Sequence, residues 1–328
     1  MAQDSKIEWT DHTFNPWEGC QKVSPGCDHC YAETRNARFG GGQAVNWGPG
    51  APRRRTSASN WNKPKVWDAA HAEFFAQHGR RQRVFCASLA DVFDNAVDPT
   101  WRADLFTLIE ATPNLDWLLL TKRIGNAADM MFLARGGHLP LLPNVWIGAT
   151  IVNQEEADRD IPKLLSVPAS VRFLSMEPLL GPVDLTDLVQ KVGPGEHHFS
   201  ALECDVETED DQWGGATIDW VIVGGESGPG ARPMSIPWAR ELRDQCVSAG
   251  VPFFFKQWGE WAPSRRYQSE VPGTFAFGDY KDDRERFVRT GHYPRAFTSF
   301  GARCILEQVG KKAAGRLLDG RTWDEVPA

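Results

Sequence analysis

Short apolar runs separated by helical segments constrain the fold of this chain more than any other feature. The runs fall at residues 84–89, 117–121, 145–150, 171–175, 220–223 and 251–255, and residues 7–19 are expected to form a first short strand before them. Continuously apolar strands joined by helices are typical of parallel strands covered on their outer side. We therefore predict an α/β fold with a partial or full (β/α) TIM-type barrel of six to seven parallel strands. A doubly wound open sheet is the alternative.

The predicted barrel extends over residues 1–258 and carries two insertions. Residues about 40–66 are rich in Gly, Pro and Asn, but aromatic residues recur there, so we expect ordered structure. Residues about 179–218 form a polar, acidic insertion. Residues 259–328 are aromatic, charged and irregular, and we expect them to form a C-terminal extension that packs on the barrel as a cap.

Composition excludes several classes of protein. The net charge of −7 rules out a basic field over the whole molecule, although a local basic surface stays possible. The N-terminus lacks the apolar segment of a signal peptide, and no apolar run reaches the ~20 residues of a membrane span. Seven cysteines, three of them clustered, do not resemble a disulfide framework. These features predict a cytoplasmic protein without membrane contact.

Three cysteines, Cys20, Cys27 and Cys30, fall within eleven residues after the first predicted strand. Thiolates that converge in a tight loop bind a soft metal or an iron–sulfur cluster. A fourth cysteine is missing nearby, since the next one, Cys86, lies in an apolar run and is expected to be buried. Three protein ligands and a vacant fourth position are typical of a reactive site, whereas a structural metal site is normally closed.

Polar residues follow most of the apolar runs. They are Asp91, Thr121, Lys122, Arg123, Thr150, Asn153, Gln154, Glu177, Gly224, Gly225, Glu226, Ser227, Lys256 and Gln257. In parallel α/β folds the carboxyl ends of the strands carry the functional site. We therefore expect these residues and the cysteine loop to meet at one rim of the sheet.

The pattern Cys20-x6-Cys27-x2-Cys30, followed by βα units, resembles the radical S-adenosylmethionine (SAM) superfamily. The closer resemblance is to the three-cysteine-motif proteins encoded by phages and bacteria. The matching segments are Thr13–Cys20, Asp91–Phe93, Ser175–Leu179, Gly224–Gly228, Lys256–Gly259 and Asp319–Trp323. The superfamily usually has three residues in the first gap and an aromatic residue before the last cysteine. Here the gap is six residues and His29 takes the aromatic position.

This resemblance implies a [4Fe–4S] cluster bound by Cys20, Cys27 and Cys30, with SAM chelating the fourth iron. Reduction by an external electron donor would then yield a 5′-deoxyadenosyl radical that abstracts a hydrogen atom from the substrate. The residues expected to bind SAM are Ser88, Asp91, Thr150, Asn153, Glu177, Gly224, Gly225 and Glu226. The cations expected to meet an anionic substrate are Lys122, Arg123, Lys256 and Arg232.

The substrate class predicted from these features is a nucleic acid or nucleotide, which suggests a role in nucleic acid modification or repair. Residues 53–67 mix cations with aromatic residues, as single-strand binding sites do. The resemblance to phage proteins points the same way. The sequence leaves open the reaction subtype and whether SAM is consumed or regenerated.

Two other interpretations of the cysteines remain. A zinc ion held by the three thiolates and by His12 or His29 would make the chain a non-catalytic, zinc-stabilised nucleic-acid-binding protein. An iron–sulfur electron carrier is less expected, because carriers normally use four protein ligands. The sequence lacks a phosphate-binding G-x4-G-K-[ST] loop, a G-x-S-x-G elbow and an H-E-x-x-H zinc helix. These absences remove the commonest hydrolase and NTPase functions.

Overall fold

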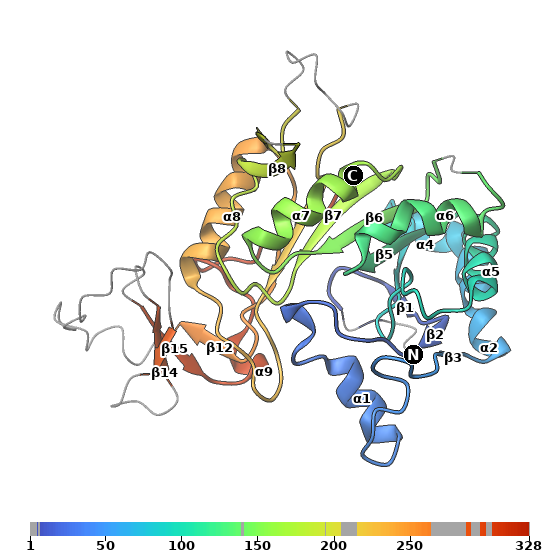
Figure 1. The fold of residues 1–328 in the computed structure, drawn as a ribbon, viewed down its shortest axis with the longest axis horizontal. Coiled ribbons are helices and arrows are strands. Elements are labelled where there is room, and N and C mark those ends of the chain that lie inside the picture. Colours follow the sequence, from blue (N-terminus) through green and yellow to red (C-terminus); the bar gives the residue numbers. More distant parts are fainter. Residues whose placement is uncertain are drawn as a thin grey trace.

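A computed structural model gives the fold (Figure 1). It describes residues 5, 7–138, 141–193, 195–204, 215–263, 287–289, 296–299 and 304–327. A parallel seven-stranded sheet forms the centre of the molecule and curves into a half-barrel. The strands in order across the sheet are β1 (His12–Phe14), β4 (Gln82–Cys86), β5 (Leu115–Thr121), β6 (Val145–Thr150), β7 (Val171–Met176), β10 (Trp220–Gly224) and β11 (Phe253–Gln257).

The order of the strands decides between the two architectures that the sequence allows. Every strand pairs in parallel with the next strand of this set along the chain. A doubly wound sheet would reverse its order at a switch point, and this sheet has no reversal. The predicted parallel α/β fold is confirmed as a half-barrel, and the doubly wound alternative is wrong.

The helices lie mostly between consecutive strands. They are α1 (Tyr31–Phe39), α2 (Ala58–Trp61), α3 (Lys63–Ala69), α4 (His71–His78), α5 (Pro99–Glu110), α6 (Ala127–Ala134), α7 (Gln154–Leu165), α8 (Ile236–Ala249) and α9 (Lys311–Ala314). Asp98 caps α5 by accepting a hydrogen bond from the N–H of Thr100, as the Asp-Pro pair predicts. Helix α8 ends at Gly250, which takes the left-handed conformation at φ 69°.

Side chains alternate between two apolar layers along each strand. The outer layer packs against the helices and includes Val84, Trp117 and Ile147. The inner layer fills the concave side of the half-barrel with Trp9, Phe85, Leu118, Trp146, Phe173, Trp220, Ile222 and Phe254. Gly148 makes this packing possible, because a Cβ there would lie 2.3 Å from the ring of Phe173. The aromatic inner layer closes the half-barrel below its carboxyl rim.

Residues near the C-terminus pack along the edge strand β11. The N–H of Phe255 donates to the carbonyl of Trp323, and the indole of Trp220 donates to the carbonyl of Glu325. Val326 packs against the inner apolar layer. Residues 323–326 therefore cover one edge of the half-barrel.

Smaller elements decorate this core. A short antiparallel pair joins β2 (Trp17–Glu18) to β3 (Arg54–Arg55). The predicted insertion contains a hairpin of β8 (Leu188–Val192) and β9 (Gly195–Phe199), while residues 205–214 lie outside the described part. A second sheet has the order β12 (Trp261–Pro263), β15 (Cys304–Gln308), β14 (Ala296–Ser299) and β13 (Phe287–Arg289). None of the described helices is both long and apolar enough to cross a membrane.

Candidate functional site

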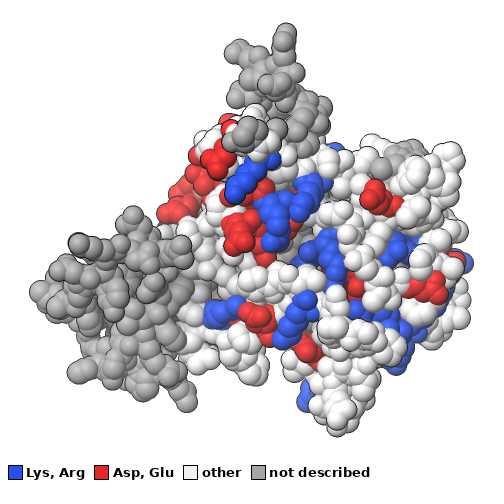
Figure 2. Space-filling model, in the orientation of Figure 1, with Lys and Arg blue, Asp and Glu red and all other residues white. Residues whose placement is uncertain are grey.

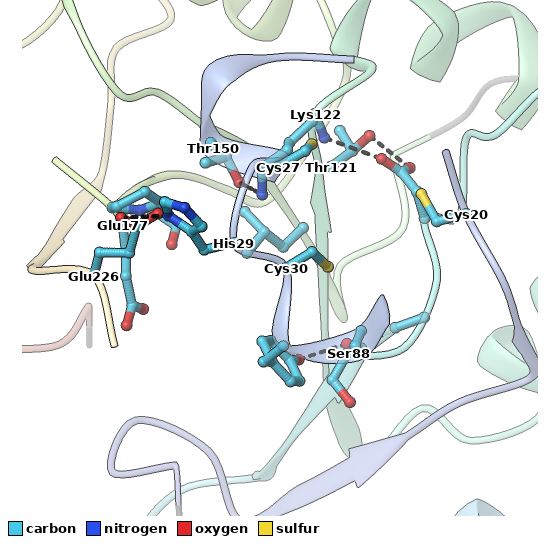
Figure 3. Close-up of a pocket in the computed structure, with 18 of the residues that line it drawn as sticks. Cys20, Cys27, His29, Cys30, Ser88, Thr121, Lys122, Thr150, Glu177 and Glu226 are labelled. Atoms are coloured by element: carbon cyan, nitrogen blue, oxygen red, sulfur yellow. Dashed lines mark hydrogen bonds and ion pairs between the residues drawn. The ribbon is translucent and has the colours of Figure 1, made fainter. Parts of the chain in front are cut away.

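The carboxyl ends of the strands surround a pocket of about 470 Å³ (Figure 3). Its walls include residues that directly follow β4, β5, β7 and β10, the last residues of β6 and β11, and the cysteine loop. Its floor is apolar and contains Ile7, Trp9, Phe85 and Leu120. Most of the predicted strand-end residues and the three cysteines meet at this rim, whereas Asn153, Gln154 and Gly224 do not line the pocket.

Backbone contacts fix the cysteine loop on this rim. The N–H of Gly19 donates to the carbonyl of Leu89, which follows β4. A 3-10 helix over Pro25–Cys27 begins at Ser24, whose hydroxyl accepts a hydrogen bond from the N–H of Gly26. Cys30 then occupies the N-cap position of α1. The chain therefore enters and leaves the loop through defined elements.

Cys20, Cys27 and Cys30 are free thiols that all line the pocket. Cys27 is buried and the other two are half-buried, and Figure 3 shows the three sulfur atoms around the same space. Among the described residues, no group of three or more His, Cys, Asp or Glu side chains has the geometry of a metal site. The donor set nevertheless fits an iron–sulfur cluster, which thiolates hold, and the pocket supplies volume beside it.

The histidines proposed as a fourth ligand lie in different places. His12 is buried outside the pocket, where its Nε2 lies 2.7 Å from Oε1 of Gln82 and its ring stacks on Trp67. His12 as a zinc ligand is therefore wrong. His29 does line the pocket, but its Nδ1 lies 3.0 Å from Oε2 of Glu226.

Asp91 lines the pocket, but protein donors occupy its carboxylate. Its carboxylate accepts hydrogen bonds from the Thr121 hydroxyl at 2.7 Å and from the N–H groups of Phe93 and Lys122 at 2.9 and 3.1 Å. It also accepts a hydrogen bond from Nη1 of Arg123 at 3.1 Å. The protein thus occupies the carboxylate that we expected to bind the SAM amine.

Arg123 faces the cysteine loop. Its Nη1 lies 3.4 Å from Sγ of Cys20, and its Nη2 donates to the carbonyl of Gln21 at 2.9 Å. Burial by itself would lower the pKa of Arg123, but Asp91 and Cys20 outweigh that effect and raise it above its ordinary value. Burial also raises the pKa of the Cys20 thiol, and Arg123 offsets only part of that increase.

Glu226 forms a compact ionic group at the opposite wall. Arg232 binds it with Nε, Nη2 and its backbone N–H at 2.9, 2.7 and 2.7 Å. Burial alone would raise the pKa of Glu226, but the hydrogen bonds from Arg232 and His29 outweigh it and hold that pKa below its usual value. Glu226 and Arg232 therefore bind one another rather than presenting free charges.

A β-bulge at the end of β11 turns two consecutive side chains into the pocket. The register between β10 and β11 shifts there, so that Gly224 pairs with Gln257 and skips Lys256. Lys256 binds Oε2 of Glu177 at 2.6 Å, and Nε2 of Gln257 donates to Oε1 of Glu177 at 2.8 Å. The carboxylate of Glu177 can only accept hydrogen bonds, so the side-chain amide of Gln257 is assigned with its nitrogen toward Glu177.

Gln257 is a rim residue that the sequence analysis named without assigning it a role. Its side chain is 5% exposed, and its Oε1 has no hydrogen-bond partner in the described structure. Buried acceptors are normally satisfied, so an unpartnered one in a pocket wall marks a place for a ligand donor. Its only sequence signal was its position after a strand.

The remaining predicted residues divide into two sets. Ser88, Thr150 and Gly225 line the pocket, as does Lys122, whose Nζ lies 3.4 Å from the Thr150 hydroxyl. Asn153 and Gly224 are not among the lining residues. Asn153 instead caps α7 by accepting a hydrogen bond from the N–H of Glu156 at 3.0 Å.

The three arginines of the basic–aromatic stretch, residues 53–67, all have partners in the protein, although only Arg53 is buried. Arg53 and Asp94 form a 2.8 Å ion pair with both side chains 1% exposed. Arg54 pairs with Glu18, and Arg55 lies 4.2 Å from the ring centroid of Trp61. Figure 2 shows Lys and Arg interspersed with Asp and Glu over the face it presents. This stretch therefore offers less free positive charge than its sequence suggests.

The fold and the site define a parallel half-barrel protein with a thiol-lined pocket at its carboxyl rim. The chain belongs to the family described as "Protein of unknown function (DUF5131)", whose model matches residues 4–327. A search of curated proteins and a search of solved structures found no match to the chain.

Proposed function

We propose that this protein is a radical SAM enzyme with a [4Fe–4S] cluster on Cys20, Cys27 and Cys30. One observation carries the proposal: the three thiols line a single pocket at the carboxyl rim of a parallel half-barrel. In this architecture that rim is where catalysis takes place. The cluster leaves one iron without a protein ligand, and the pocket provides the space beside it.

The neighbouring carboxylates support an open coordination position. Asp91 is occupied by four protein donors, and Glu226 is occupied by Arg232 and His29. Asp91 cannot become a fourth ligand without leaving the buried donors Thr121 and Arg123 unpaired, which costs about 1–3 kcal/mol for each. The donors to Glu226 are more exposed, but they also occupy its carboxylate. The protein therefore favours three ligands over four.

Bound together, the cluster and SAM supply one-electron chemistry that removes a hydrogen atom from the substrate. The chain's own residues bind and orient these groups. The unpartnered Oε1 of Gln257 accepts a hydrogen bond from a ligand amine or hydroxyl. The apolar floor of Trp9, Phe85 and Leu120 excludes water from beneath the reacting groups.

We extend the proposal to an anionic substrate, such as a nucleic acid or nucleotide, in a cytoplasmic setting with an external electron donor. The support is Lys122, a half-buried pocket cation with no carboxylate partner among the described residues. Single-stranded DNA, single-stranded RNA and nucleoside monophosphates are the probes. Lys122→Ala is expected to weaken binding of the correct class and to reduce its salt dependence.

Anaerobic reconstitution with iron and sulfide tests the enzymatic assignment. The wild-type chain is expected to bind four irons per chain in the proposed cluster and to release 5′-deoxyadenosine when SAM and dithionite are added. Cys246→Ala is a matched control, because that buried cysteine lies on α8 outside the pocket. A chain that keeps one zinc ion and no cluster after this treatment would instead support the zinc-stabilised binding protein.

A further inference from the structure

Arg123 is a pocket cation whose side chain the protein almost encloses. Its side chain is 8% exposed and lies between the cysteine loop and Asp91. One nitrogen, Nη1, reaches both Sγ of Cys20 at 3.4 Å and Oδ2 of Asp91 at 3.1 Å. The other, Nη2, donates to the carbonyl of Gln21 at 2.9 Å. The guanidinium therefore bridges the cysteine loop and the segment that follows β4.

The surroundings of Asp91 keep the guanidinium in this position. The Asp91 side chain is 7% exposed and is held by the Thr121 hydroxyl and by two backbone N–H groups. If Arg123 swung into the pocket, it would leave a buried carboxylate without its counter-ion, and breaking a buried ion pair is strongly unfavourable. Arg123 is thus unsuited to the role of a mobile cation for substrate.

The contact distinguishes one cysteine from the other two. In the part of the chain that the structure describes, neither Cys27 nor Cys30 receives a side-chain N–H at its sulfur. Reduction adds an electron to a cluster, and hydrogen bonds to its sulfur ligands and nearby positive charge stabilise the added negative charge. The fixed guanidinium of Arg123 therefore donates a hydrogen bond to the sulfur of Cys20 and to neither of the other two cysteine sulfurs.

We propose that Arg123 is a positioning residue that holds Cys20 and raises the reduction potential of the bound cluster. This inference rests on the proposed function, because it requires a cluster on the three cysteines. The electron itself comes from an external reductant, which is dithionite in the test. Asp91 supports the effect by fixing the guanidinium, and its own charge moderates it.

The test compares reconstituted wild-type, Arg123→Met and Arg123→Lys proteins in redox titrations followed by electron paramagnetic resonance. In the methionine variant the equilibrium constant for one-electron reduction is expected to fall about tenfold, which is about 59 mV. The lysine variant keeps the charge, so it is expected to restore part of the potential. Iron release to a chelator, a second readout, is expected to be fastest in the methionine variant.

Arg102→Met is the matched control. Arg102 is also buried, but it donates to the carbonyls of Val92 and Asp94 at 2.9 Å and does not line the pocket. Its replacement is expected to lower stability without moving the potential. An equal shift in this control, or an unchanged potential in Arg123→Met, would overturn the inference.

Two outcomes separate this inference from the proposed function. Failure of the wild-type chain to assemble a cluster overturns the proposed function and the inference with it. A wild-type cluster with the same potential in both Arg123 variants overturns only the inference. If Arg123→Met does not hold a cluster, the reduction potential of Arg123→Lys tests the inference. That potential is expected to lie below the wild-type value, because a single ammonium cannot reproduce the three contacts of the guanidinium. A wild-type potential in that variant would then overturn the inference.

Discussion

The two ends of the central sheet both carry charged residues but use them differently. At the amino end, Asp11 accepts two hydrogen bonds from Arg80, at 2.7 and 2.9 Å, and one from the N–H of Arg83 at 2.7 Å. Asp219 likewise accepts a hydrogen bond from the N–H of Arg172. These contacts join the starts of neighbouring strands, so this end serves stability.

The carboxyl end has ion pairs of similar quality but leaves particular groups without protein partners. The three cysteine sulfurs border a cavity, Lys122 lacks a carboxylate partner among the described residues, and Oε1 of Gln257 has no donor. The ion pairs at this end lie in the walls of a pocket, whereas those at the amino end join neighbouring strands. Buried atoms without a partner also occur at the amino end, at Nε of Arg83 and Nε of Arg172, but these residues do not line the pocket. The comparison teaches that unpaired groups locate the site where they also border a cavity.

The largest expected effect is at the carboxyl end. Cys27→Ser is expected to lower the iron bound after anaerobic reconstitution by at least about tenfold, because a hydroxyl is a poor substitute for a thiolate ligand. Iron and sulfide analysis measures this effect, with Cys246→Ala as the control. Iron content equal to that of the wild type would exclude Cys27 as a ligand and would place the cluster elsewhere.

The second-largest expected effect is a loss of stability from a substitution at the amino end of the sheet. Asp11→Asn is expected to lower the free energy of unfolding at pH 7 by about 1–3 kcal/mol, because Arg80 loses a partly buried partner. Iron content should not change. Urea denaturation measures the loss, and a parallel loss of cluster would contradict the separation of the two ends.

The same variant has a pH dependence of defined sign. Burial alone would raise the pKa of Asp11, but Arg80 and the N–H of Arg83 outweigh it and lower that pKa below its ordinary value of 3.8. The stabilisation from Asp11 is therefore complete above this ordinary value and is lost as the pH falls through the lowered pKa. The difference in stability between wild type and Asp11→Asn should shrink in that acidic range. A constant difference would contradict the ion-pair explanation.

A smaller effect is expected at Gln257. Gln257→Leu removes the unpartnered acceptor and is expected to weaken SAM binding to the reconstituted protein about tenfold, the value of one net hydrogen bond of about 1.4 kcal/mol. Isothermal titration calorimetry measures the change. Gln245→Leu is the control, because Gln245 bonds backbone groups of Val183 and Leu185 outside the pocket. Unchanged affinity at Gln257 would remove it from the site.

The smallest expected effect is in the basic–aromatic stretch. Arg55→Ala should change the affinity for single-stranded oligonucleotides by less than about threefold, because Arg55 is already paired with Asp104 and stacked on Trp61. Fluorescence anisotropy against Lys122→Ala gives the comparison. A larger loss at Arg55 than at Lys122 would return the nucleic-acid surface to residues 53–67.

The apolar runs were sufficient to predict the strands, because buried parallel strands are apolar on both faces. The run 145–150 coincides with β6, whereas the run 251–255 ends before the bulge that completes β11 at Gln257. In the sequence, polar residues at the end of a strand cannot be told from the start of a loop. The apolar runs therefore located the rim, but they did not predict that the bulge turns the side chains of Lys256 and Gln257 into the pocket.

Individual roles depended on geometry that one-dimensional patterns do not contain. Asn153 precedes Gln154-Glu155-Glu156, which is an N-cap signal, and it serves as the cap of α7 rather than as a ribose ligand. The contact between Arg123 and Cys20 joins residues 103 positions apart. The sequence was sufficient to name Lys122, Arg123, Lys256 and Arg232 as candidate cations of the site. Only the fold shows which side chains each of them binds.

The segment along β11 has a consequence for how the chain is made. Strand β11 leaves the ribosome before residues 323–326, so its outer edge stays exposed while residues 258–322 are synthesised. An open strand edge can pair with other chains until it is covered. The seven strands are thus synthesised before the residues that cover the edge of β11. Chaperone protection would matter most while residues 258–322 are being synthesised.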